Sequence, residues 1–287
     1  MELRAPAKIN LSFRILSRRE DGFHEIETLM APVSLYDELT INRTDRGFEF
    51  VCDDPGIPSG GDNLVVRAAR LFLEAAKLEV GLRIELRKVI PHGAGLGGGS
   101  SDAASTLLGL NELLGVGFAE TRLAQLASAI GSDVPFFIYR SAAICRGRGE
   151  LVTPNELSQQ LRLLLLKPSF GVPTPWAYSR WKDATALPGI DYAAQEFRGA
   201  KFVNDLERPV FEKHVFLAAL KMWLRAQPEV AVALMSGSGS TLFAVLQDNA
   251  DAELLATRAK AELDPDLWSC ACETVRDAGF EPATSCV

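Results

Sequence analysis

The 287-residue chain is 47% hydrophobic and 23% charged, a composition typical of globular proteins and sufficient for one large or two medium domains. Its formal net charge of -7 argues against nucleic acid and anionic membranes as partners, because the overall field repels both. No apolar run approaches the roughly 18 residues of a membrane span, and residues 1–10 lack the apolar core of a secretory signal.

Five cysteines are scattered along the chain, namely Cys52, Cys145, Cys270, Cys272 and Cys286. An odd and scattered set does not resemble a disulfide framework, so a reducing, cytoplasmic location is the expectation. Cys270 and Cys272 form a C-x-C pair, but a metal site needs further ligands nearby, and we expect none there. The sequence leaves the oligomeric state open between a monomer and a homodimer.

The first half of the chain contains both strand and helix patterns. Residues 7–16 alternate apolar and polar side chains, which predicts a half-buried strand with Lys8 and Asn10 on its polar face. Helical spacing over 61–77 predicts a helix with Asp62 or Asn63 as its N-cap. Further strands are expected over 37–41, 48–52 and 81–90, and further helices over about 100–115 and 123–130.

In the second half, predicted strands and helices occur in groups rather than in regular alternation. This pattern favours an α+β fold over a doubly wound sheet. We expect strands over 142–150, 162–168 and 240–246 and one long helix over 204–225. The segment "TPNELSQQ" at 153–160 breaks the pattern. It predicts a domain boundary that divides the chain into residues 1–155 and 156–287.

The segment "PHGAGLGGGSSDAAS", residues 91–105, contains five glycines within seven positions. Glycine is costly to order, so such density needs a reason. The segment joins an expected strand to an expected helix that begins around Ser100-Ser101-Asp102. Backbone N–H groups at a helix start, unshielded by side chains, form a good anion site. The pattern therefore predicts a loop that wraps a polyphosphate, whereas a plain connecting turn would not need so many glycines.

Two other phosphate-binding motifs do not fit the same segment. No Gly-Lys-Ser/Thr closes the loop, so it is not a P-loop. Gly93, Gly95 and Gly98 match the spacing of the dinucleotide fingerprint, which also needs an acidic residue about twenty residues later at the end of a strand. The corresponding stretch, "FAETRLAQL", has a helical pattern, and we reject a Rossmann fold.

The loop resembles the second motif of the GHMP kinases, the superfamily of galactokinase and of homoserine, mevalonate and phosphomevalonate kinases. Within it, the triple glycine before "SSDAA" is most similar to the members that phosphorylate a cytidine diphosphate-linked methylerythritol. Six further segments agree in order, from "PAKINL" to "MSGSGSTLF". They are 6–11, 21–29, 131–137, 173–178, 204–207 and 235–243. The tail from residue 275 resembles no part of the family, and we assign it no role.

The resemblance implies a two-domain α+β kinase with an N-terminal ATP-binding domain and an active site in the inter-domain cleft. ATP, with Mg²⁺, would phosphorylate the 2-hydroxyl of the cytidyl substrate in the non-mevalonate route to isoprenoid precursors. The implied partners are these small molecules. The nucleotide contacts would come from the loop, namely Pro91, His92, Gly93, Ala94, Gly95, Leu96, Gly97, Gly98, Gly99, Ser100 and Ser101. Ser100 and Ser101 would contact phosphate or Mg²⁺, and the sequence identifies no acidic metal ligand.

Two charged residues match the catalytic positions of the family. Lys8 would favour an ionised aspartate and stabilise the phosphoryl charge, although a lone strand lysine is usually a solvated edge charge. Asp133 would accept the proton of the substrate hydroxyl. From local sequence, Asp133 also reads as the N-cap of a short helix with Pro135 in its first turn. Spacing along the chain cannot show whether the two side chains meet.

Aromatic and polar residues match the substrate site of the family. Phe23 would stack on cytosine and His24 would hydrogen-bond its edge, although relatives often carry tyrosine at the first position. Tyr178 is the candidate for the other face of the base, ahead of Trp176. Thr174 and Asn10 would bind substrate hydroxyl or phosphate groups.

Other interpretations remain open from the sequence. Gly237 and Gly239 resemble the third motif of the superfamily, but a plain turn before the following strand is equally consistent. The chain could be another small-molecule GHMP kinase, of the homoserine or mevalonate type, although "DGFH" and "PTPWAY" suggest an aromatic clamp that such acceptors do not need. A non-catalytic nucleotide-binding protein would have to lack the base, whereas Lys8 and Asp133 are both present.

Overall fold

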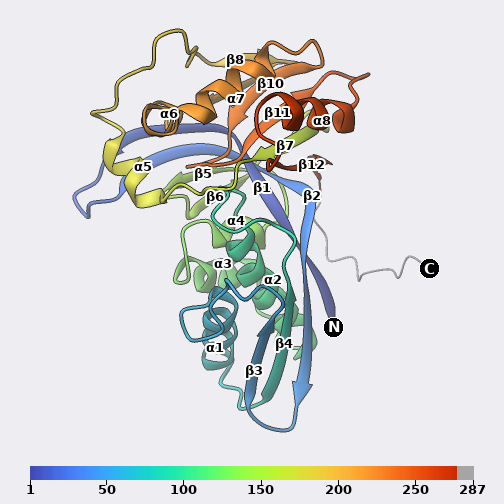
Figure 1. The fold of residues 1–287 in the computed structure, drawn as a ribbon. Helices are drawn as coiled ribbons and strands as arrows, with labels where there is room; N and C mark the ends of the chain where they lie inside the picture. The colour runs from blue at the N-terminus through green and yellow to red at the C-terminus, as the bar shows by residue number, and fades with distance from the viewer. Residues whose placement is uncertain (277–287) are drawn as a thin grey trace.

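The structure is a computed structural model that describes residues 1–276. Nearly all of the tail to which no role was assigned, together with Cys286, lies outside the described residues. The fold is α+β, as expected (Figure 1). One part contains α1–α4 beside β3 and β4, and the other contains α6–α8 beside the second sheet. The long strands β1 and β2 run through both parts.

A large sheet forms the centre of the described chain. The strand order is β3-β4-β2-β1-β9-β8, and β5 pairs with both β2 and β6. Its strands are β1 (Glu2–Arg18), β2 (His24–Thr44), β3 (Phe48–Cys52), β4 (Gly81–Arg87), β5 (Ala143–Gly147), β6 (Leu151–Pro154), β8 (Gln195–Phe197) and β9 (Ala200–Asn204). β8 and β9 come from the second half of the chain, so the large sheet continues across the domain division expected near residue 155. That division stays a prediction.

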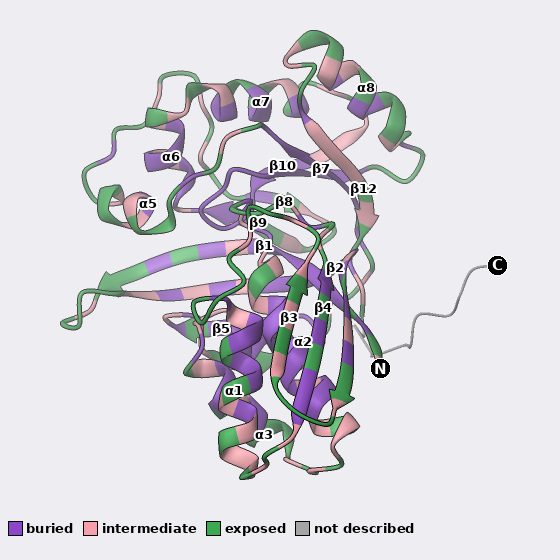
Figure 2. Cartoon of the chain, turned by 60° about the horizontal axis from the view of Figure 1, so that its bottom comes forward, coloured by how far each residue is buried: buried purple, intermediate pink, exposed green. Residues whose placement is uncertain are grey.

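The second sheet has the order β10-β11-β7-β12, and its described neighbours are all antiparallel. Its strands are β7 (Arg162–Lys167), β10 (Val230–Met235), β11 (Leu242–Leu246) and β12 (Trp268–Glu273). β7 and β11 are buried along nearly their whole length, which explains why their sequences are continuous apolar runs rather than alternating ones. Figure 2 shows this burial beneath α7 and α8.

The helices cover the two sheets. They are α1 (Leu64–Ala76), α2 (Gly98–Leu113), α3 (Glu120–Ser128), α4 (Val134–Ile138), α5 (Thr174–Arg180), α6 (Glu207–Lys213), α7 (Val215–Arg225) and α8 (Ala252–Glu262). Asn63 caps α1, because its side chain accepts a hydrogen bond from the Val65 N–H at 2.8 Å. Of the two predicted caps, Asn63 is therefore the correct one.

Two predictions need correction. The helix expected over 204–225 is two helices, because His214 at φ −113°, ψ 70° interrupts it, and residue 204 belongs to β9. The strand expected over 7–16 is longer, and Lys8 and Asn10 on its polar face are buried rather than half exposed. The glycine loop covers this face, since a Cβ at Gly97 would lie 3.0 Å from Lys8 Cγ.

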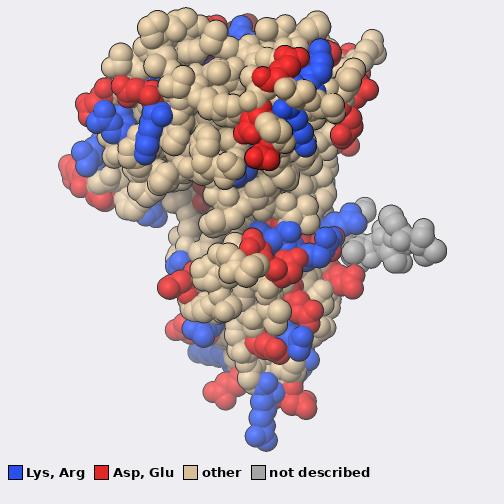
Figure 3. Space-filling view, viewed as in Figure 1, with Lys and Arg blue, Asp and Glu red and all other residues tan. Residues whose placement is uncertain are grey.

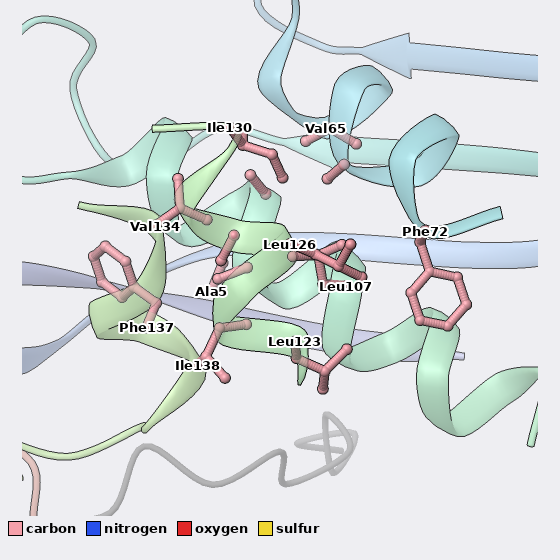
Figure 4. Close-up of a cluster of buried hydrophobic side chains, with 14 of the residues drawn as sticks. Ala5, Val65, Phe72, Leu107, Leu123, Leu126, Ile130, Val134, Phe137 and Ile138 are labelled. Carbon is pink, nitrogen blue, oxygen red and sulfur yellow. The ribbon is translucent and has the colours of Figure 1, made fainter. Parts of the chain in front are cut away.

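The core beside α1–α4 fixes the position of the N-terminal part of the site. Side chains from these four helices pack together on the apolar face of the large sheet, as Figure 4 shows for Phe72, Leu107, Leu126 and Val134. Alanines at 103 and 104 let α2 lie close to its neighbours. The start of α2 and the α3–α4 connection are therefore held on one rigid body.

Candidate active site

The glycine loop adopts a conformation that side chains would disfavour. Gly93, Gly95 and Gly97 all have positive φ, at 63°, 77° and 72°. Gly97 occupies the N-cap position of α2, which begins at Gly98, two residues earlier than expected. No side chain caps this helix, so the amides of its first turn stay available for an anion.

A second glycine-rich segment, residues 235–241, packs directly against this loop. A Cβ at Gly95 would lie 2.3 Å from the carbonyl oxygen of Ser236, so only glycine allows the contact. The Ser236 hydroxyl donates to the Gly95 carbonyl at 3.0 Å, and the Thr241 N–H donates to the Ala94 carbonyl at 3.2 Å. Of the two interpretations of Gly237 and Gly239, the geometry therefore fits a segment that braces the loop.

The segment "NDLE" in turn holds residues 235–241. The Asn204 amide donates to the carbonyls of Met235 and Gly237, at 2.7 and 2.8 Å. Glu207 accepts from the Met235 N–H at 3.0 Å and forms a buried ion pair with Lys221. Burial raises the pKa of Glu207, and Lys221 opposes this effect. Both glycine segments are thus fixed by buried polar contacts.

The loop borders a cavity of about 490 Å³, called here the loop pocket. It is lined by every predicted nucleotide-binding residue except Leu96 and Ser101, and also by Lys8, Asn10 and Asp133. Leu96 is buried in the core, and its carbonyl accepts from the Lys8 N–H at 2.9 Å. Ser101 is also buried, and its hydroxyl oxygen has no hydrogen-bond partner.

Lys8 and Asp133 meet at one end of the loop pocket. Lys8 Nζ lies 3.7 Å from Asp133 Oδ2, with Lys8 4% and Asp133 40% exposed. Burial lowers the pKa of Lys8, while the nearby Asp133 and Cys145 oppose that shift. Asp133 occupies the N-cap position of α4, with Pro135 in the first turn, as the local sequence predicts, but its side chain makes no capping hydrogen bond. The carboxylate instead faces the ammonium group and the cavity.

A second cavity, of about 650 Å³, lies beside the turn between β1 and β2 and is called here the hairpin pocket. Phe23, His24 and Tyr178 line it, as do Arg148 and Trp181. The His24 and Tyr178 rings lie 5.2 Å apart, and the Arg148 guanidinium lies 4.9 Å from the centre of the Phe23 ring. Trp176 lines neither cavity and packs instead near Lys213 and His214.

The surroundings of His24 favour its neutral form. Burial and then the positive charges of Arg18 and Lys182 lower its pKa. A neutral imidazole has one donor and one acceptor, which suits reading the edge of a polar ring. The same basic side chains, with Arg148, outnumber the two aspartates that line this pocket, Asp133 and Asp183, within a chain of negative net charge. Across the face in Figure 3, by contrast, charges of both signs are interspersed.

The two pockets share three lining residues, Asp133, Thr174 and Tyr178. The Thr174 hydroxyl lies 2.7 Å from that of Ser238, which links α5 to residues 235–241. A molecule in the loop pocket and another in the hairpin pocket would therefore meet at a carboxylate with a lysine beside it. This arrangement can transfer a group from one molecule to the other while removing a proton.

Sequence reasoning missed a buried charge cluster beneath the loop. Lys88 pairs with both Asp37 and Asp102, the latter at 2.8 Å. Asp37 also accepts from the N–H groups of Val89 and Ile90, at 2.6 and 2.8 Å. The cluster ties the end of β4 to the start of α2. In the sequence, Lys88 precedes the glycines and Asp102 follows them, so this pair could have been predicted. Asp37 is distant in sequence, and no local pattern indicates its contact with Lys88.

No helix among residues 1–276 is both long and apolar enough to cross a membrane. In the same part of the chain, no group of three or more His, Cys, Asp or Glu side chains could hold a metal ion.

Comparison with known proteins gives consistent matches. Residues 63–141 match the family model described as GHMP kinases N terminal domain, and residues 193–264 match that described as GHMP kinases C terminal. The chain is 44% identical to the 4-diphosphocytidyl-2-C-methyl-D-erythritol kinase of Methylacidiphilum infernorum, over 92% of this chain and 93% of that protein. Identity to the enzyme of the same name from Geobacter sp. (strain M21) is 39%, over 92% and 94%.

Solved structures agree with these matches. A crystal structure of 4-(cytidine 5'-diphospho)-2C-methyl-D-erythritol kinase superposes with a TM-score of 0.78 at 38% identity, covering 96% of this chain and all of that one. Homoserine kinase from Cytophaga hutchinsonii superposes with a TM-score of 0.70 at 20% identity, covering 97% of this chain and 95% of that one. The second likeness shows the fold alone.

Proposed function

Because the chain belongs to the 4-diphosphocytidyl-2-C-methyl-D-erythritol kinases of the GHMP family, we propose that it phosphorylates the 2-hydroxyl of that cytidyl alcohol with ATP. The products are ADP and the 2-phosphate, and the reaction serves the non-mevalonate route to isoprenoid precursors. The observation that carries the proposal is the meeting of two pockets at Asp133, with Lys8 beside it.

ATP occupies the loop pocket in this proposal. The triphosphate lies along Gly93–Ser100, where positive-φ glycines expose backbone amides and α2 directs the positive end of its dipole. The fit is supported by the uncapped first turn of α2 and by the absence of side chains from the glycine backbone. Leu96 and Ser101 do not line the loop pocket. They support ATP binding through the backbone of the loop and of α2.

Asp133 serves as the general base. It accepts the proton of the substrate 2-hydroxyl as the oxygen forms its bond to the γ-phosphorus and the bond from phosphorus to ADP breaks. Its partial exposure leaves room for an acceptor, and Lys8 Nζ lies 3.7 Å from its carboxylate oxygen. Lys8 also stabilises the negative charge that develops on the transferred group.

The acceptor occupies the hairpin pocket. The cytosine ring stacks on Phe23, with Tyr178 on its other face and His24 hydrogen-bonded to its edge. Arg148 places positive charge over Phe23, where it can attract the diphosphate. Asn10 and Thr174 bind hydroxyl or phosphate groups of the acceptor near the junction of the two pockets.

Mg²⁺ fits the site as an ion held by the triphosphate rather than by a protein cage. Among the described residues, no group of three or more His, Cys, Asp or Glu side chains could hold a metal ion, whereas the Ser100 hydroxyl lines the loop pocket and can supply a hard oxygen ligand. When bound, the ion offsets charge on the phosphate oxygens.

An ADP-release assay with three acceptors tests the proposal. The cytidyl methylerythritol should be turned over, and homoserine and mevalonate should not. Release of ADP with homoserine or mevalonate alone would identify another small-molecule GHMP kinase. ATP binding without turnover of any acceptor would contradict the proposal as a whole.

A further inference from the structure

Three hydrogen bonds, of which the two that involve Asn10 are buried, lead from the backbone of β1 to the ammonium group of Lys8. The Thr28 hydroxyl donates to the Ser12 carbonyl at 2.6 Å. The Asn10 amide nitrogen donates to the Thr28 hydroxyl oxygen at 2.8 Å, and Lys8 Nζ donates to Asn10 Oδ1 at 2.7 Å. Asn10 and Thr28 are each 1% exposed, so water does not substitute for these partners.

The order of donors and acceptors in this chain follows from Thr28. A hydroxyl has one proton, and Thr28 gives it to the Ser12 carbonyl, so the oxygen presents only lone pairs to Asn10. Asn10 must then direct its NH₂ group toward Thr28, which turns its carbonyl oxygen toward Lys8. The opposite orientation would place amide protons against an ammonium group.

The Ser12 carbonyl is available because the β1–β2 pairing is irregular at this point. The register shifts between Asn10 and Ser12, so Phe13 rather than Ser12 lies opposite Thr28. Such a bulge disrupts the ladder locally and leaves backbone groups for other partners. The Thr28 side chain thereby joins the bulge to the site.

Few groups around Lys8 oppose the effect of burial on its charge. Burial disfavours the ammonium form, and the charged or ionisable groups that oppose this effect are Asp133 before α4 and Cys145 on β5. Residues 235–241 contribute no charged group at this point. The Asn10 carbonyl is therefore one of few acceptors that stabilise the charged form.

We propose that Thr28 is a positioning residue that fixes the amide orientation of Asn10 and thereby keeps Lys8 charged and directed at Asp133. The inference rests on the proposed role of Lys8 in phosphoryl transfer, but the orientation of Asn10 follows from the hydrogen bonds alone. Thr28 lines the loop pocket, yet it acts through Asn10 rather than on a substrate.

The test compares Thr28→Val, which removes the hydroxyl at similar volume, with Thr28→Ser, which retains it. We expect kcat to fall about 5- to 100-fold in Thr28→Val, because turning the Asn10 amide would remove its buried hydrogen bond to the charged Lys8, with KM for ATP nearly unchanged. Thr28→Ser should recover most of kcat. Thr106→Val is the matched control, because it removes another buried hydroxyl that donates to a backbone carbonyl, at 2.7 Å. It should not change kcat.

A second measurement does not depend on turnover. NMR titration of labelled lysine, with Lys8 assigned through Lys8→Arg, should give a lower pKa for Lys8 in Thr28→Val than in the parent protein. Thr28→Ser and Thr106→Val should leave that pKa unchanged. If the parent protein turns over no acceptor, the proposed function fails, while this titration still tests the positioning role.

Three results would overturn the inference. The Lys8 pKa could be the same in Thr28→Val as in the parent protein. Thr28→Ser could be as impaired as Thr28→Val, which would assign the effect to the methyl group and its packing. Thr28→Val could lower the melting temperature while kcat of the folded protein stays that of the parent.

Discussion

Lys8 Nζ lies 3.7 Å from Asp133 Oδ2, although Lys8 comes from the middle of β1 and Asp133 immediately precedes α4. The pairing depends on the core beside α1–α4, which places the α3–α4 connection next to the large sheet (Figure 4). Helix packing therefore brings together a cation and a carboxylate at the point where two cavities join.

Phe23→Ala should raise KM for the cytidyl substrate and leave KM for ATP unchanged. Stacking on a base is worth about 1–3 kcal/mol, which corresponds to a rise of about 5- to 150-fold. Phe23 is 52% exposed, so its replacement should cost little stability. Initial rates with each substrate varied in turn measure both constants.

Leu16→Ala is the matched control for that prediction. Leu16 is another exposed apolar residue, near the end of β1, and it lines neither pocket. It should not change either KM. An unchanged KM for the cytidyl substrate in Phe23→Ala would remove the stacking role of that ring.

Gly95→Ala should weaken ATP binding. The added Cβ would lie 2.3 Å from the Ser236 carbonyl oxygen at a φ of 77°, so the loop must move away from residues 235–241. We expect KM for ATP to rise about tenfold or more, equivalent to at least about 1.4 kcal/mol of binding free energy. Titration with a non-hydrolysable ATP analogue would measure the loss directly.

The control for Gly95 is Gly189→Ala. Gly189 has a similar φ of 78°, but a Cβ there would meet no atom within 4 Å. Its replacement carries the same backbone strain without moving the loop, so stability should fall while KM for ATP stays constant. If Gly95→Ala behaves like this control, the close contact between the two segments does not matter for ATP.

The Asp102 carboxyl should make stability depend on pH. Burial raises the pKa of Asp102 to about 8, with Asp37 adding to the effect and Lys88 opposing it. A folded pKa above the unfolded value of 3.8 stabilises the protein while Asp102 is protonated. That contribution is present in full below the unfolded pKa and is lost as the pH rises through about 8.

Asp102→Asn tests this effect, because an amide has the shape of the carboxyl but does not titrate. Urea unfolding of both proteins at several pH values should show the parent losing stability relative to the variant between about pH 5 and about pH 9. A constant difference over this range would mean that Asp102 is ionised throughout, with Lys88 fully compensating its charge.

The sequence predicted those parts of the site that depend on local patterns. The glycine loop and the start of α2 follow from one short segment, and the first strand follows from strict alternation. Family resemblance added Phe23, His24 and Tyr178, which the structure brings to one pocket. Periodicity along the chain carries no information on which elements pack together.

Other features were missed or predicted wrongly because they depend on tertiary contacts. The pairing of Asp37 with Lys88 requires β2 and β4 to be neighbours, which no local signal encodes. Asp133 takes the N-cap position that the local sequence predicts, but only the tertiary fold shows that its side chain faces Lys8. The break at His214 occurs within a continuous helical pattern, so periodicity alone predicted one helix.

Turnover by Asp133→Asn tests the central claim most directly. The amide keeps the shape of the side chain but cannot accept the hydroxyl proton, so kcat with ATP and the cytidyl substrate should fall by about 10²- to 10⁴-fold while ATP binds with unchanged affinity. If Asp133→Asn keeps the kcat of the parent, or loses ATP affinity in proportion to its activity, Asp133 is not the base of this reaction.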